Sequence, residues 1–179
     1  MTKEHIAGTK PMPEAEKYKP RETRLVAEYV LKQYAPWQKI FSPRLGPIPP
    51  ELTEKVGKEQ AASLYRVYRP YPDALVITSA SLILIEGKIR ASVEAVGQLL
   101  LYKKLIPVTP ELAQYSMLRI DLEIVTPWPN PTLEYAIHDY GIKLVVFHPN
   151  WIAEYLEHKQ NYTTADYRKL KDFKKREGI

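Results

Sequence analysis

The sequence predicts a single mixed α/β domain. Segments with helical spacing of apolar residues alternate with short apolar segments of strand-like composition, which is typical of a sheet flanked by helices. A length of 179 residues suits one domain with a hydrophobic core. The 45% hydrophobic and 26% charged residues are an ordinary globular composition.

Several classes of protein are excluded by composition. Every apolar run is far shorter than the roughly 20 residues that span a bilayer, and the first residues lack the apolar core of a secretory signal. The absence of cysteine excludes disulfides, thiolate metal sites and a cysteine nucleophile. We therefore expect a cytoplasmic protein without membrane contact. A net charge of +5 and a pI of about 9.2 are compatible with a polyanionic partner.

The first element is a helix that follows an N-terminal arm. Residues 1–20 contain prolines among charges and no apolar period, so we expect an extended or disordered arm. Helical spacing begins at residue 21 and ends before Pro36. One face of this helix carries the apolar residues Leu25, Val26, Tyr29 and Val30.

A strand over 37–42 and a proline-rich connection follow the first helix. Pro50 is expected to open a second helix that runs to about Leu64. Residues 65–69 alternate between polar and apolar side chains, as a strand does.

The centre of the domain consists of two strands, 74–78 and 81–89. The second contains four consecutive apolar residues, Leu82 to Ile85, typical of a strand buried on both faces. Residues 91–105 predict a long helix. Thr109 followed by Pro110 resembles an N-cap with proline at the first helical position, so a short helix should come next.

Strands are also expected at 117–125 and 142–147, with a proline cluster between them, and Asn150 can cap a helix over 151–158. Residues 21–158 thus form the predicted domain. Residues 159–179 carry seven basic and three acidic residues, a net +4, and predict a basic helical extension.

Asp73, Glu86 and Lys88 are the residues most suggestive of chemistry. Residues two apart in a strand share a face, so Glu86 and Lys88 project together from the end of an apolar strand, on the same side as Leu82 and Leu84. If the two central strands are antiparallel, Asp73 comes near Glu86. Adjacent carboxylates repel each other and call for a cation, and oxygen ligands favour Mg²⁺ or Mn²⁺.

These residues carry a family resemblance. Pro72-Asp73, twelve residues, then Glu86-Gly87-Lys88 resembles the signature of the PD-(D/E)XK nuclease superfamily. The resemblance covers roughly residues 21–125 and implies a restriction-endonuclease-like αβββαβ core, with a mixed central sheet flanked by helices. It also implies hydrolysis of DNA through a metal-activated water, with the cation held by Asp73, Glu86 and the carbonyl of Gly87, and with Lys88 beside that water.

Two further features extend this resemblance. Gln98 and Tyr102 lie four apart on the long helix and resemble the Gln-x-x-x-Tyr motif of RecB-type members, which implies a catalytic role for both. The family often adds a glutamate from its first helix as a metal ligand. Glu22 and Glu28 both qualify; Glu22 is preferred because it lies three and four residues before the buried Leu25 and Val26.

Candidate DNA contacts come from basic residues elsewhere. Arg66 and Arg69 lie between tyrosines that could stack on bases, and Arg44 lies in the proline-rich loop. In the C-terminal extension the candidates are Lys169, Lys171, Lys174 and Lys175.

The leading hypothesis is a Mg²⁺- or Mn²⁺-dependent deoxyribonuclease, and the sequence leaves open whether it is an endonuclease or an exonuclease. Cleavage of both strands would suggest a homodimer, because one domain of this kind supplies one active centre. The alternative is a catalytically silent protein of the same fold, acting in DNA binding or as a structural component of a phage or mobile-element assembly.

Overall fold

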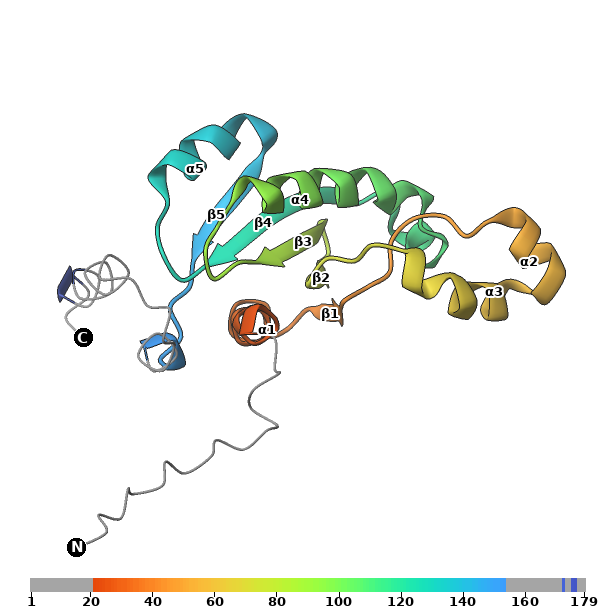
Figure 1. The fold of residues 1–179 in the computed structure, drawn as a ribbon, viewed down its shortest axis with the longest axis horizontal. Helices are drawn as coiled ribbons and strands as arrows, with labels where there is room; N and C mark the ends of the chain where they lie inside the picture. Colours follow the sequence, from red (N-terminus) through yellow and green to blue (C-terminus); the bar gives the residue numbers. More distant parts are fainter. Residues whose placement is uncertain (1–20, 154–171, 173–174, 177–179) are drawn as a thin grey trace, which may run out of the picture.

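A computed structural model describes residues 21–153, 172 and 175–176. Its described part contains a five-stranded mixed sheet in the order β1-β2-β3-β4-β5 (Figure 1). The strands are β1 (Gln38–Phe41), β2 (Ala74–Ile77), β3 (Ser81–Gly87), β4 (Arg119–Thr126) and β5 (Ile142–Val146). β1, β2 and β3 are antiparallel neighbours, whereas β3, β4 and β5 run parallel. The prediction of a mixed sheet flanked by helices is confirmed.

The two sheet faces are covered by different helices. α1 (Arg21–Gln33) packs on one face through its predicted apolar stripe, and α4 (Val93–Leu105) packs on the other. Along β3, Ile83 and Ile85 belong to the α1 core, and Leu82 and Leu84 belong to the α4 core. All of β2 and β3 is buried, as the continuous apolar run predicts.

Each parallel pair is joined by a crossover. α4 connects β3 to β4, and α5 (Pro131–Ile137) connects β4 to β5 on the α4 side. The sequence analysis did not predict α5. Its start signal was present, because the Asn130 side chain accepts a hydrogen bond of 3.0 Å from the Leu133 N–H and Pro131 occupies the first helical position.

The connection between β1 and β2 forms two helices that extend away from the sheet (Figure 1). The expected single helix is wrong, because Gly57, with φ of +82°, separates α2 (Pro50–Val56) from α3 (Lys58–Tyr65). The expected strand over 65–69 is also wrong. The chain there completes α3 and turns through η2 (Arg66–Tyr68), a 3₁₀ turn, since no strand pairs with it.

Three further 3₁₀ segments are η3 (Ile106–Val108), η4 (Pro110–Tyr115) and η5 (His138–Tyr140). The short helix predicted after Thr109 is therefore a 3₁₀ segment. Thr109 does not cap it through its side chain; its hydroxyl donates to the Leu105 carbonyl at 2.7 Å and accepts from the Gly46 N–H at 2.8 Å. Thr109 thus links the end of α4 to the proline-rich loop.

The predicted arm over 1–20 lies outside the described residues, as does all of the C-terminal extension except 172 and 175–176. The helix expected over 151–158 is described only at 151–153, which are helical. Among the described helices, none combines the length and the apolar character needed to cross a membrane.

Candidate active site

The β2–β3 register brings the two predicted carboxylates together. Ala74 pairs with Ile85 in this antiparallel ladder, so the next step places Asp73 opposite Glu86. Alternation along β3 places Glu86 on the same face as Leu82 and Leu84, the face covered by α4. The antiparallel arrangement on which the sequence prediction depended is therefore present.

Glu86 is a buried acid with incomplete hydrogen bonding. The residue is 4% exposed, its Oε1 lies 3.0 Å from Lys88 Nζ, and its Oε2 has no partner within the described part of the chain. Burial, followed by the nearby charge of Asp73, raises the pKa of Glu86 to about 7, although Lys88 opposes the shift. A second cation at Oε2 would stabilise its ionised form.

Asp73 is held by the chain that carries Glu86. Its Oδ2 accepts a hydrogen bond of 2.8 Å from the Gly87 backbone N–H. Burial raises the pKa of Asp73, while the Gly87 N–H and the charge of Lys88 oppose that rise. This hydrogen bond fixes one carboxylate oxygen of Asp73 against the end of β3.

Lys88 is protonated and positively charged at neutral pH. Burial lowers its pKa, but the hydrogen bond and negative charge of Glu86, with smaller contributions from Glu22 and Asp73, raise it above the ordinary value. Its side chain remains 17% exposed. The site therefore presents a charged ammonium group that solvent, or a ligand, can still reach.

α4 supplies the Gln98–Tyr102 pair beside the carboxylates. Gln98 and Tyr102 lie one turn apart on α4, and the buried Oε1 of Gln98 has no partner within the described part of the chain. Burial, then the charges of Glu86 and Asp73, raise the pKa of Tyr102 to about 12. The helix thus places this pair where the carboxylates act on it electrostatically, and Tyr102 stays a neutral hydroxyl.

The structure separates the two candidate glutamates of α1. Glu22 accepts a hydrogen bond of 3.2 Å from the Ile89 N–H, and its charge acts on Asp73 and Lys88. Glu28 instead pairs with Arg24 at 2.8 Å and accepts from Trp151 Nε1 at 3.0 Å. Only Glu22 therefore lies at the candidate active site.

The described residues contain no group of three His, Cys, Asp or Glu side chains arranged to hold a metal ion. Asp73 and Glu86 are two candidate oxygen ligands. Glu22 is not placed to be the third ligand in this arrangement. The unpartnered Oε2 of Glu86 and the oxygen-only donor set nevertheless fit a hard divalent cation.

The arginines predicted to bind DNA fall into different environments. Arg69 is 4% exposed, and its guanidinium makes two hydrogen bonds, of 2.7 and 2.8 Å, to the Glu111 carboxylate and a third to the Arg44 carbonyl. A surface phosphate contact does not fit this buried position, because the guanidinium already binds a carboxylate inside the protein. Sequence alternation could not indicate a partner 42 positions away.

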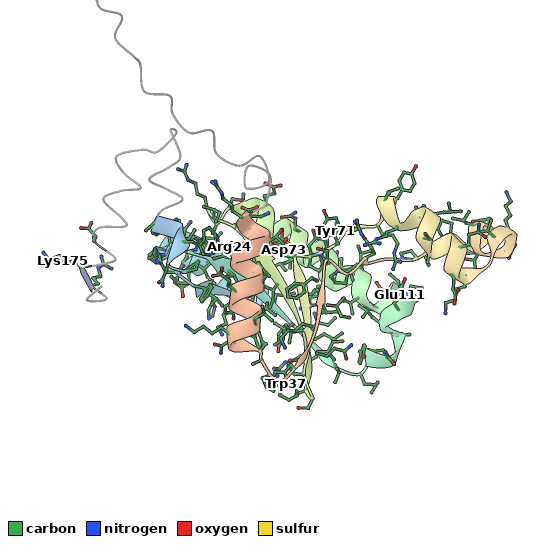
Figure 2. The ribbon with its side chains drawn as sticks, turned by 90° about the horizontal axis from the view of Figure 1, so that it is seen from below. Arg24, Trp37, Tyr71, Asp73, Glu111 and Lys175 are labelled. Carbon is green, nitrogen blue, oxygen red and sulfur yellow. The ribbon has the colours of Figure 1, made fainter. Side chains whose placement is uncertain are left out.

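Arg44 lies with its guanidinium 4.0 Å from the centre of the Tyr71 ring and donates to the Arg69 carbonyl at 3.1 Å. Tyr71 and Asp73 lie close together (Figure 2). Arg66 is exposed on η2, and Lys175 is exposed as well. The expected contacts at Lys169, Lys171 and Lys174 lie outside the described residues.

Two features of the structure were absent from the sequence prediction. Glu123 on β4 is buried on the α1 side, where its carboxylate accepts from Tyr29 at 2.8 Å and Tyr34 at 3.0 Å. Trp128 follows β4 and lines a pocket beside the candidate active site. The signals were an acid within an apolar strand and a tryptophan between two prolines.

Comparison with known proteins gives one structural likeness. No family model and no curated protein sequence matches the chain. A crystal structure of a repair endonuclease from Pyrococcus abyssi aligns with a TM-score of 0.43 and 15% identity, over 80% of this chain and 50% of that chain. This chain thus spans half the length of that endonuclease. Similarity at this level does not assign a function.

Proposed function

We propose that the protein is a metal-dependent nuclease that hydrolyses DNA phosphodiester bonds. The observation that carries the proposal is the pairing of Asp73 and Glu86 across β2 and β3, with Lys88 at 3.0 Å from Glu86 and one Glu86 oxygen unpartnered. Two partly desolvated carboxylates beside a protonated lysine are a costly arrangement for structure alone.

A divalent cation accounts for this arrangement. Asp73 and Glu86 would hold Mg²⁺ or Mn²⁺ through carboxylate oxygens, joined by the carbonyl of Gly87. When bound, such an ion lowers the pKa of a water and neutralises charge on a phosphate oxygen. The raised pKa of Glu86 supports the proposal, because burial and then the charge of Asp73 disfavour its ionised form, and a bound cation would offset both.

The protein side chains orient the carboxylates, stabilise charge on the phosphate and position the DNA. Asp73 is oriented by the Gly87 N–H, which binds one of its two carboxylate oxygens and leaves the other for a cation. Lys88 donates hydrogen bonds and positive charge to the phosphate as negative charge develops on it. Tyr102 and Gln98 position the nucleic acid backbone from α4, since both are neutral hydrogen-bonding groups beside the carboxylates. Arg66 and the basic C-terminal segment supply phosphate contacts.

One observation favours the second candidate, a protein of this architecture that binds DNA without cleaving it. Glu22, the third acid, is occupied by the Ile89 N–H, and the described acids form no three-ligand group. A structural role in a phage or mobile-element assembly belongs to the non-cleaving alternative. A homodimer belongs to the nuclease hypothesis, for the case in which both strands are cleaved.

A nicking assay separates the two functions. Supercoiled plasmid is incubated with the full chain in Mn²⁺, in Mg²⁺ and in EDTA. A nuclease converts it to open-circle or linear form in metal only, and Asp73→Asn removes that activity while leaving the melting temperature at or above the wild-type value. If the plasmid stays supercoiled but is retarded on a gel, the binding function replaces the nuclease.

A further inference from the structure

A pocket adjoins the candidate active site at the carboxyl ends of β3 and β4. Its volume is about 430 Å³, within the range of small-molecule sites in proteins. The Lys88 N–H donates to the Val125 carbonyl, which places the end of β4 beside Lys88. The pocket is lined by Arg90, Ala91, Thr126, Trp128, Pro129, Asn130 and Pro131.

The chemistry of the lining favours an aromatic, anionic ligand. Trp128 provides an indole ring, which stacks on flat aromatic groups, and Arg90 provides a guanidinium that binds phosphate. None of the residues that line the pocket is acidic, so the pocket is unsuited to a cation. A nucleotide combines the two features that this lining matches.

The walls of the pocket are held in place before any ligand arrives. Asn130 accepts from the Leu133 N–H at 3.0 Å and donates to the Ala91 carbonyl at 3.5 Å, which links the two loops that enclose the pocket. The Trp128 ring packs edge-on against His148, with 5.2 Å between ring centres. Pro129 and Pro131 restrict the backbone further. A fixed pocket binds with a smaller entropic cost.

The pocket lies about as far from Lys88 as one nucleotide of a DNA strand lies from the next. Arg90 follows Lys88 by two residues, so their Cα atoms lie at most about 7 Å apart. A strand whose phosphate lies at Lys88 would therefore bring its next nucleotide to the pocket.

We infer that this pocket holds the base of an unpaired nucleotide next to the cleaved phosphodiester bond. The inference rests on the proposed nuclease function and names its substrate: DNA with an unpaired nucleotide at the cleavage position. A base stacked and paired inside a duplex cannot enter a pocket, whereas an unpaired base enters at lower cost. Trp128 stacks on the base and Arg90 binds the phosphate on its far side.

The test measures binding without cleavage. Two oligonucleotide duplexes are compared in Ca²⁺ and in EDTA, one fully paired and one with a single unpaired 2-aminopurine nucleotide. The wild-type chain should bind the second more tightly, and the 2-aminopurine fluorescence should change on binding. Trp128→Ala should weaken binding to the unpaired duplex by at least about fivefold, the lower limit for loss of a stacking aromatic residue.

Trp37→Ala is the matched control. Trp37 is 39% exposed and precedes β1, whose first residue, Gln38, pairs with Ile77 at the opposite end of β2 from Asp73; Figure 2 labels the two far apart. It should bind both duplexes as the wild type does. If Trp128→Ala does not fold, as shown by its melting curve, Trp128→Leu provides the same comparison, because it keeps an apolar side chain without the aromatic ring.

The outcomes separate this inference from the proposed function. Cleavage of plasmid with equal affinity for both duplexes overturns the pocket and retains the nuclease. A preference for the unpaired nucleotide that Trp128→Ala abolishes, in a chain that cleaves nothing, supports the pocket and overturns the nuclease. Loss of affinity for both duplexes alike in Trp128→Ala overturns the base-specific role.

Discussion

The backbone N–H of Gly87 donates a hydrogen bond of 2.8 Å to Oδ2 of Asp73, so the strand that carries Glu86 also orients the opposing acid. A side chain at Gly87 would disturb this arrangement. A Cβ there would lie 2.4 Å from Val26 Cγ2, which belongs to a fully buried side chain of α1, and 3.2 Å from the Glu22 carbonyl. Glycine thus lets α1 approach the end of β3.

We predict that Gly87→Ala destabilises the protein by about 1–3 kcal/mol, the usual cost of overpacking a core, and lowers nuclease activity. Denaturant unfolding measures the first effect. Gly97→Ala is the control, because a Cβ at this position on α4 meets nothing within 4 Å. That variant should gain about 0.5–1 kcal/mol from helix propensity. Equal stability of the two variants would contradict the close packing at Gly87.

Lys88→Ala should reduce plasmid cleavage by roughly 10²–10³-fold, the loss seen when one transition-state donor is removed. Stabilisation by Mn²⁺ should persist, because the ammonium group is not a metal ligand. Lys143→Ala is the matched control: Lys143 lies 3.5 Å from the other buried acid, Glu123, on the opposite face of the sheet. Its turnover should stay within about twofold of wild type. Near-normal turnover of Lys88→Ala would contradict the role of Lys88.

The raised pKa of Glu86 predicts a pH-dependent loss of stability. Between its ordinary value of 4.5 and its folded value of about 7, the folded state keeps a proton that the unfolded state releases. The contribution of Glu86 is therefore fully present below pH 4.5 and is lost as pH rises through about 7. Asp73, whose pKa is also raised by burial, adds a loss of the same sign.

Glu86→Gln removes this loss, since glutamine stays neutral. We expect it to melt roughly 2–8 °C above wild type at pH 8 without metal, as about 1–2 kcal/mol would produce in a chain of this length after screening by nearby water. At pH 5 the two should melt at nearly the same temperature. If Glu86→Gln melts at or below the wild-type temperature at pH 8, the ionised Glu86 carboxylate does not destabilise the folded protein.

Mn²⁺ should reverse that loss in the wild type. A cation between Asp73 and Glu86 stabilises the folded state by about 2.7 kcal/mol at a concentration of 100 Kd, and the increase should be larger at pH 8 than at pH 5, where protons compete. Glu86→Gln should abolish the Mn²⁺-dependent rise in melting temperature. Glu123→Gln, in which another buried carboxylate is neutralised, should retain it. An equal rise in both variants would place the ion elsewhere.

The sequence was most informative where one element determines its own environment. The apolar run at 82–85 predicted a strand buried on both faces, and alternation from it correctly put Glu86 on the same face as Leu84. The α1 stripe likewise matches the four residues buried in the structure. In such cases the spacing of apolar residues within one helix or strand decides which side chains face the core.

Prediction failed where the environment is made by distant parts of the chain. Nothing near Arg69 indicates that Glu111 will bind it, and nothing near Trp128 indicates that Arg90 and Ala91 will help to enclose a pocket. The alternation of 65–69 suggested a strand, but a strand needs a neighbour with which to pair, and the β1–β2 connection leaves the sheet at this point.

The contrast between Arg69 and Arg66 can be tested directly. Arg69→Ala removes two hydrogen bonds to Glu111, whose side chain is half exposed, and should destabilise the protein by roughly 1.5–3 kcal/mol. Arg66→Ala, three residues earlier and exposed, should leave the melting temperature unchanged. Its effect should fall on DNA binding: loss of one phosphate contact lowers the log–log salt slope on duplex DNA by about 0.9. Anisotropy titrations at several salt concentrations, beside thermal melts, separate the two arginines. An Arg69→Ala variant with wild-type stability and a flatter salt slope would restore that residue to the DNA-binding surface, because a buried structural ion pair cannot produce that combination.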